Sequence, residues 1–393
     1  MVLPLSGEEA GGGIEDRVSD RFDVRVQPGL GFRQDAEAGK VRREGFEAAV
    51  TVSGAYDDNI YLSASSAEKD FVVRLAPSVA YVYGDPNGKD GGYIRVAYRP
   101  VGVIYSDHGD SNRIDQDASW DLGWRGSKVA VAYGGRVRQL GDATADAGRQ
   151  TDRLVLEQAV RLAWTPREKL SFELAAGQSS NDYRDRQLFD SRSAYGEAAL
   201  RYLYSPKTRI GIAYRAGTFE VDGAGDQKVQ RGTVQLEWQP REKISFNVEA
   251  GAEHREFDAG SSTSPVIEAK VAWKPREGTE IFVGGYRRTE ASAYLPGQNY
   301  DLTGASLGVS QRLGEKWSAR LEGGLEKADY KRVSGTGTAN RRDDIVFIRP
   351  SVRFQVNENM EVEGFYRFER DESSQAGFGY DNHSVGIQVG YKF

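Results

Sequence analysis

From residue 45 onward, apolar and polar residues alternate one by one along the chain, which is the pattern of β-strands. Segment 71–83 is typical, because Phe71, Leu75 and Val79 all fall on odd-numbered positions, whereas Arg74 and Ala76 fall on even-numbered ones. The same alternation recurs in segments 114–124, 154–164, 234–238, 267–273, 346–354 and 385–393. No convincing helical period follows residue 45, so the sequence predicts an all-β chain.

Short segments rich in turn-forming residues connect these strands two by two. They lie at 84–88, 125–127, 165–169, 205–208, 239–243, 274–278, 313–316 and 357–359. Between them lie longer segments rich in Asp, Ser and Gly, for example 107–112, 141–149 and 178–190. Tight turns that alternate with long loops are typical of transmembrane antiparallel up-and-down barrels, with the turns periplasmic and the loops extracellular. Two strands per turn and one at each end predict about 18 strands, from 46–56 to 382–393.

An internal repeat leaves a second architecture open. Segment 164–172 recurs at 238–246, and solenoids and propellers also repeat at such periods. The tryptophans favour the barrel, because indole prefers the membrane interface and a propeller has no reason to align tryptophans at one end of successive hairpins. The tryptophans beside the short turns are Trp124, Trp164, Trp238, Trp273 and Trp317.

The hydrophilic composition is consistent with a barrel, because strands that alternate apolar and polar residues are hydrophilic on average. The 393 residues include 52 Lys and Arg against 58 Asp and Glu, and the mean hydropathy is −0.59. No run of about 18 apolar residues exists, which excludes a bundle of membrane-spanning helices. The absence of cysteine excludes disulfides, thiol nucleophiles and cysteine metal sites. No basic stripe forms, which argues against a nucleic-acid partner.

The two ends of the chain carry different expectations. Residues 1–42 do not fit the strand scheme and are expected to lie in the periplasm or folded into the lumen, with the barrel over residues 43–393. No signal peptide is visible, so we expect the signal of an integral protein of the bacterial outer membrane to have been removed. The last strand ends on an aromatic residue and resembles the β-signal that the barrel-assembly machinery recognises. Its expected key residues are Val389, Tyr391 and Phe393.

The polar register is strongly charged and would face the lumen. Such charges need water or partners, and barrels of about 16 to 18 strands are wide enough for an aqueous channel. Arginine dominates lysine there, and its planar fork suits carboxylate or phosphate. An ordinary wall of cross-strand ion pairs, for example Arg353 facing Glu363, is the alternative. The candidate pore-lining residues are Arg74, Arg95, Arg99, Arg138, Arg161, Arg201, Arg215, Arg231, Arg288, Arg320, Arg349, Arg353, Glu157, Glu249, Glu322 and Glu363.

Metal binding and catalysis are not favoured. Asp residues such as Asp142, Asp146 and Asp182 gather in the predicted loops, but no Ca²⁺-binding loop motif is present, so solvated loops touching lipopolysaccharide are expected instead. His254 beside Ser261 or Ser262 is the only local pair for a barrel esterase. We expect no enzyme activity, no metal and no cofactor.

The first hairpin carries a recognisable motif. Tyr56-Asp57-Asp58-Asn59 is followed by Asp70-Phe71 and a mid-strand Pro77. Residues 54–79 thereby resemble the putative beta-barrel porin type 2 family, whose members often accompany exopolysaccharide synthesis and export. The resemblance implies a barrel from residue 45 onward and favours polysaccharide export over a general porin, but it assigns no functional residue. The strand count and arginines are also similar to those of the alginate export porin.

Two functions follow as hypotheses. The first is an outer-membrane channel, either a conduit for an anionic exopolysaccharide or a pathway for small anionic solutes. The second is a non-conducting assembly or surface-anchor barrel whose lumen is occluded. The expected partners are outer-membrane lipid and lipopolysaccharide, together with periplasmic polysaccharide-export components.

Overall fold

The computed structural model describes residues 44–85, 90–144, 146–147, 149–223, 225–258, 260–292, 294, 298–332 and 341–393. The segment expected at residues 1–42 lies outside them. Within the described residues, eighteen long strands make up one sheet. They are β1 (Gly45–Asp57), β2 (Asp70–Tyr83), β3 (Gly91–Tyr105), β4 (Arg113–Arg125), β5 (Val129–Leu140), β8 (Arg153–Arg167), β9 (Leu170–Tyr183), β10 (Ser191–Ser205), β11 (Thr208–Val221), β12 (Gly225–Arg241), β13 (Ile244–Phe257), β14 (Gly260–Trp273), β15 (Thr279–Ala291), β16 (Gln298–Leu313), β17 (Trp317–Arg332), β18 (Arg342–Gln355), β19 (Met360–Ser373) and β20 (Tyr380–Lys392).

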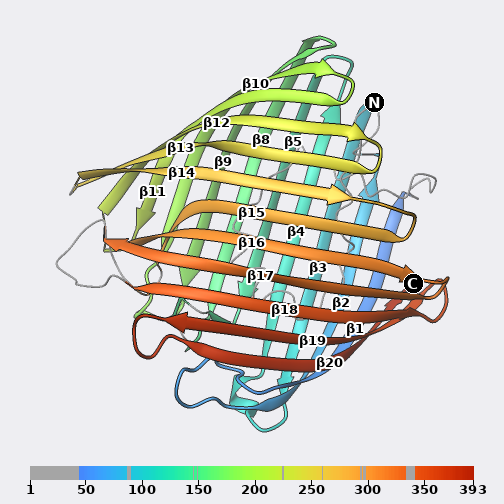
Figure 1. Cartoon of the computed structure of the whole chain (residues 1–393), viewed down its shortest axis with the longest axis vertical. Coiled ribbons are helices and arrows are strands. Elements are labelled where there is room, and N and C mark those ends of the chain that lie inside the picture. Colours follow the sequence, from blue (N-terminus) through green and yellow to red (C-terminus); the bar gives the residue numbers. More distant parts are fainter. Residues whose placement is uncertain are drawn as a thin grey trace.

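The sheet closes into a barrel. Each strand pairs antiparallel with the next along the chain, and β1 pairs with both β2 and β20. Figure 1 shows the blue and green strands forming the far wall and the yellow to red strands the near wall. Closure leaves no open first or last edge, so backbone groups can be paired around the ring. The predicted all-β barrel with eighteen strands is confirmed.

The two ends of the barrel differ. All eight predicted short turns join neighbouring strands at one end, where the Phe393 N–H donates to the Ala48 carbonyl at 2.9 Å and so places the chain terminus. The connections at the other end are mostly longer, and one of them contains a small hairpin of β6 (Ala143–Thr144) and β7 (Arg149–Gln150). We call these the turn end and the loop end.

One predicted loop is shorter than expected. Residues 178–183 continue β9, so the connection to β10 covers only residues 184–190. The strand pairs there with β10 as far as Asn181↔Ser191. Polar residues at the loop end of a strand carry no apolar alternation, which is why the sequence pattern missed them.

The outer face is apolar and carries aromatic residues at the turn end. Trp164 and Trp238 are 49% and 42% exposed, and they stack on Phe172 and Phe246 of the neighbouring strands with ring centroids 5.4 and 4.9 Å apart. This arrangement matches the interfacial belt that the tryptophan positions predicted. No helix within the described residues is long and apolar enough to cross a membrane.

The family-like motif lies where the first and last strands meet. Asn59 is 1% exposed, and its side-chain amide donates to the carbonyls of Ser63 and Asp381, both at 2.9 Å. Asn382 of β20 donates to Asp57 Oδ1 at 2.7 Å and to the Asn59 carbonyl at 3.1 Å. These bonds fix the connection 58–69 over the junction of β1 and β20. The motif therefore has a structural role at the closure of the barrel.

Candidate channel lining and loop-end constriction

The strand register separates an apolar outer face from a charged inner face. On β2, Phe71, Leu75 and Val79 are 43 to 46% exposed, whereas Val72 and Arg74 between them are almost fully buried. Because successive side chains of a strand point to opposite faces, the buried set faces the inside of the ring. The polar register used in the sequence analysis is thus the inner register.

The predicted lining residues lie on this inner register with different exposure. Arg95 is exposed near the turn end. Four others are buried, namely Arg74, Arg138, Arg288 and Glu157. The remainder are partly exposed, namely Arg99, Arg161, Arg201, Arg215, Arg231, Arg320, Arg349, Arg353, Glu249, Glu322 and Glu363.

Many of these arginines form ion pairs with acids on adjacent strands. Arg353 bonds to Glu363 at 2.8 Å, as expected from the turn between them. Arg215 bonds to Glu197 at 2.6 Å, and Arg320 bonds to Glu322 on its own strand at 2.9 Å. The wall therefore contains the cross-strand ion pairs that the sequence offered as one alternative, and the arginine-lined pathway stays a prediction.

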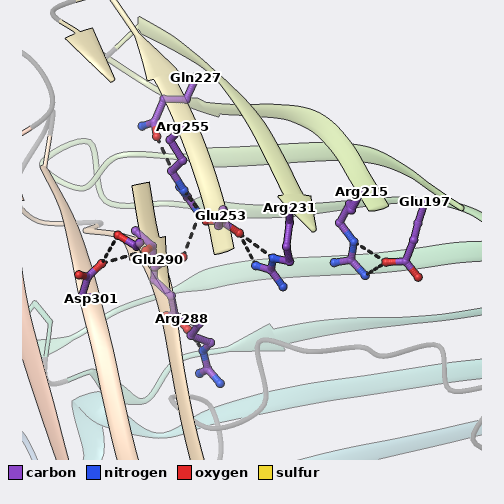
Figure 2. Close-up of polar contacts among 11 residues, drawn as sticks. Glu197, Arg215, Gln227, Arg231, Glu253, Arg255, Arg288, Glu290 and Asp301 are labelled. Atoms are coloured by element: carbon purple, nitrogen blue, oxygen red, sulfur yellow. Dashed lines mark hydrogen bonds and ion pairs between the residues drawn. The ribbon is translucent and has the colours of Figure 1, made fainter. Parts of the chain in front are cut away.

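Figure 2 shows the densest part of this network, where Glu253 lies between two arginines. Glu253 is 2% exposed, and its two oxygens accept separately from Arg231 and from Arg255, the latter at 2.7 Å. Arg255 and the acid Asp117, which joins Arg99 and Arg136 on β3 and β5, were not among the predicted lining residues. The period-two register from Glu253 to Arg255 was the signal that could have identified Arg255.

A repeated unit of three residues positions several arginines. In each unit an aromatic residue stands directly opposite a glycine of the neighbouring strand. A Cβ on that glycine would overlap the ring, and an arginine guanidinium lies over the ring with 4.1 to 5.2 Å to its centroid. The units are Gly177–Tyr195–Arg215, Gly308–Phe282–Arg320, Gly304–Tyr286–Arg288, Gly324–Phe347–Arg349 and Gly386–Phe365–Arg367.

These units give the inner wall a defined chemistry. One ring face rests near glycine backbone and the other is covered by a cation, an attractive contact of about 0.5 to 2 kcal/mol. Lacking a Cβ, each glycine lets the ring lie flat, which keeps both ring and guanidinium against the wall. In these five units an arginine guanidinium therefore lies over an aromatic face of the inner wall.

The connection 141–152 between β5 and β8 crosses to the far wall of the barrel. Asp146 accepts from Ser292 Oγ at 3.0 Å and from Tyr330 Oη at 2.8 Å, and its carbonyl accepts from Arg341 at 2.9 Å. Tyr330 and Arg341 belong to the β17–β18 region, which is well separated from β5 and β8 around the ring. We call this connection the transverse loop.

The transverse loop corrects one expectation. Asp142 and Asp146 were predicted to be solvated loop residues, but Asp142 is 6% exposed and bonds to Arg153 at 2.8 Å. Asp146 is one partner of Arg341, whose side chain is fully buried and also bonds to Asp343 at 2.7 Å. Both aspartates are internal because they bond to partners of which the local sequence pattern gives no sign, and those of Asp146 are distant in the sequence.

Other contacts at the loop end hold the transverse loop against the wall, and we call the resulting cluster the constriction. The Arg341 guanidinium lies between two rings, 3.8 Å from the centroid of Phe378 and 4.7 Å from that of Tyr330. Leu62 of the first loop packs with Ala143 of the transverse loop. Four connections thus meet at the loop end, namely those that contain Leu62, Ala143, Arg341 and Phe378, and they narrow the loop end of the lumen.

The remaining predicted sites lie on β20 and β13. Val389, Tyr391 and Phe393 lie in or just after β20, with Tyr391 and Phe393 exposed and their rings 5.0 Å apart. His254 bonds through Nδ1 to Thr263 Oγ1 at 2.9 Å rather than to either neighbouring serine. Among the described residues, no group of His, Asp and Glu is arranged to hold a metal ion.

The fold and the sorted register define the class: the chain is an outer-membrane β-barrel of porin type. The family model described as Putative beta-barrel porin 2 matches residues 260–393, and this is the family that the motif in the first hairpin resembles. No curated protein matches the chain in sequence.

Several solved porin structures are similar to the chain. OccAB4 of Acinetobacter baumannii matches with 11% identity and a TM-score of 0.49, covering 90% of this chain and 99% of that one. OpdQ of Pseudomonas aeruginosa matches with 11% identity and a TM-score of 0.47, covering 88% and 97%. OpdK of the same organism, solved with vanillate, matches with 9% identity and a TM-score of 0.48, covering 88% and 99%.

Proposed function

We propose that the barrel is a channel for small anionic solutes and that arginines of the inner wall select them. The observation that carries the proposal is Arg349. Its guanidinium is stacked on Phe347 at 4.6 Å, and its buried Nη2 has no hydrogen-bond partner among the described residues. Arg349 as a whole is partly exposed on the inner register, and a guanidinium with an unmade hydrogen bond, which costs about 1 to 3 kcal/mol, favours an anionic acceptor at its accessible side.

Small anions suit the wall better than the exopolysaccharide that the family resemblance implies. A pyranose chain slides best along open aromatic faces, on which its C–H bonds can pack against the negative ring face. Five inner rings are instead covered by arginine on one side and lie against glycine on the other. The transverse loop also crosses the lumen and so reduces the width through which a polymer would have to pass.

The test is ion selectivity in planar bilayers under a KCl gradient. We expect the wild-type channel to favour chloride, and the double variant Arg349→Gln with Arg353→Gln to shift the reversal potential toward potassium. Arg342→Gln, a variant of an exposed arginine at the loop-end rim, is the matched control and should leave the potential unchanged. An unchanged potential in the double variant would exclude the arginines as the selecting groups. Block by an anionic polysaccharide at micromolar concentration would favour the polymer instead.

An occluded barrel is the second candidate, and the transverse loop is the observation that favours it. A loop tied to the far wall through a fully buried arginine is arranged as a closure. Wild-type protein without conductance, together with conducting Asp146→Ala protein, would support a closed channel. Silence of both, and of protein lacking residues 1–42, would support a surface anchor.

A further inference from the structure

The ladder between β14 and β15 stops halfway along the strands. Their register runs from Trp273↔Ile281 only to Ile267↔Arg287. Beyond that point β14 stays paired with β13, and β15 stays paired with β16. The edges 260–266 and 288–291 therefore face each other without a ladder on the loop-end side of the wall. Figure 1 shows β14 diverging from β15 toward this end.

Polar side chains bridge this split, from the inner register of β12 and β13 to the facing parts of β15 and β16. Arg255 donates through Nη2 to the Thr289 carbonyl at 2.9 Å, which satisfies a backbone acceptor on the unpaired edge. Gln227 of β12 and Asn299 of β16 bond to each other at 2.8 Å across the same region. All three bridging side chains belong to residues that are at most 6% exposed. The wall is closed here by side chains instead of backbone (Figure 2).

Two cations share one carboxylate at the same split. Asp301, whose side chain is 3% exposed, accepts through Oδ2 from Arg287 at 3.1 Å and from Lys331 at 2.6 Å. Its other oxygen accepts from Thr289 Oγ1 at 2.9 Å, which fixes the carboxylate. Within this group of three, two positive charges share one negative charge, and the buried Arg287 Nε has no hydrogen-bond partner among the described residues.

The split begins where the apolar outer face ends. Below it the outward residues are apolar, with Ile267 at 44%, Val283 at 48% and Leu325 at 60% exposure. At and above it they are polar, and the unpaired edge of β14 carries an exposed hydroxyl run at residues 261–263. Unpaired backbone is tolerated outside the hydrocarbon region and not within it. The split therefore lies at the level of the outer-leaflet headgroups.

We propose that this split is a lateral binding site for the phosphorylated sugar headgroup of an outer-leaflet glycolipid. Arg287 and Lys331 supply charge-assisted bonds to phosphate, and the hydroxyl run with its open backbone edge supplies the contacts that a sugar needs. Asp301 acts as the positioning residue, because its carboxylate holds both cations together at the split. The proposal is independent of what passes through the lumen.

The test measures bound lipid by native mass spectrometry of detergent-purified protein titrated with diphosphoryl lipid A. The double variant Arg287→Gln with Lys331→Gln should lower binding by about tenfold, as expected for the loss of two exposed charge-assisted contacts. Arg370→Gln is the matched control, since Arg370 is also an exposed outward arginine at the loop end, paired with Asp381 at 2.6 Å. The control and the charge-conserving Lys331→Arg variant should bind as the wild type does.

Two results would overturn the proposal. One is equal lipid binding by the wild type and the double variant, with both folded as judged by heat-modifiable gel mobility. The other is equal wild-type binding of lipid A stripped of its phosphates. Displacement of the lipid by millimolar inorganic phosphate would show a general phosphate site and would also contradict the lipid assignment.

Discussion

Removing the Asp146 carboxylate is the sharpest way to learn what the transverse loop does. In Asp146→Ala, the loop loses its side-chain bonds to Ser292 and Tyr330, at 3.0 and 2.8 Å. The Asp146 carbonyl keeps its bond from Arg341, and Arg341 keeps Asp343 as its carboxylate partner. The variant therefore weakens the attachment of the loop without leaving an unpaired buried charge.

The expected effect can be estimated from the two bonds. Hydrogen bonds to a charged acceptor contribute about 1.5 to 3 kcal/mol each, so their loss weakens loop closure by about 3 kcal/mol. Since 1.4 kcal/mol is tenfold in an equilibrium constant, the released population rises by about 100-fold. A loop that is released once in ten thousand molecules would then be released in about one in a hundred.

Single-channel recording measures this change directly. Asp146→Ala should show frequent excursions to a higher conductance level, and Asp146→Asn, which keeps an acceptor oxygen, should show fewer. Conductance and gating identical to the wild type in both variants would refute the constriction, because the loop would then lie outside the ion path. Ser66→Ala, in a neighbouring exposed loop segment, is the control.

Three further outcomes are expected. Gly177→Ala should push the Tyr195 ring off the wall and destabilise the barrel by about 1 to 3 kcal/mol in urea unfolding, whereas Gly196→Ala, where a Cβ meets nothing within 4 Å, should be neutral. Asn59→Ala should lower the temperature at which the compact gel band converts to the unfolded one, because several buried bonds at the strand junction are lost. The hydrogen bond with Asp70 raises the pKa of His108, so its contribution to holding the connection 106–112 is complete below the ordinary His pKa and disappears as the pH rises through the raised value. Limited proteolysis of this connection should accelerate over that interval, and the pH dependence should vanish in His108→Ala.

Much of the architecture could be predicted because a barrel repeats one local rule. Period-two alternation located the strands, and Pro-Arg-Glu or Gly-Asp-Pro segments located the turns. Where the rule weakens, the prediction fails, as at residues 178–183, where an all-polar strand end was taken for a loop. The membrane enforces alternation only across its apolar thickness.

The constriction, and the aromatic rings that support the arginines, could not be predicted from the sequence for a different reason. Asp146 meets Tyr330 across 184 positions of sequence, and no local pattern encodes such a contact. Gly304 and Tyr286 are opposite each other only because of the register of β15 and β16. Sequence could indicate that arginines lie inward, but their ring supports depend on which residues face each other across strands.

The junction of β1 and β20 has a consequence for how the barrel is made. Asn59 bonds to its own loop and to Asp381, and Asn382 reaches back to Asp57, so the lock joins the first and last strands of the ring. These contacts join residues 322 and 325 positions apart, and contacts of such long sequence separation form slowly. These bonds can form only when both the first and the last strand are present. A chain that lacks its final strand keeps an unpaired edge on β1, and Asn59 lacks its bond to Asp381. The bonds at this junction therefore distinguish the finished barrel from an incomplete one.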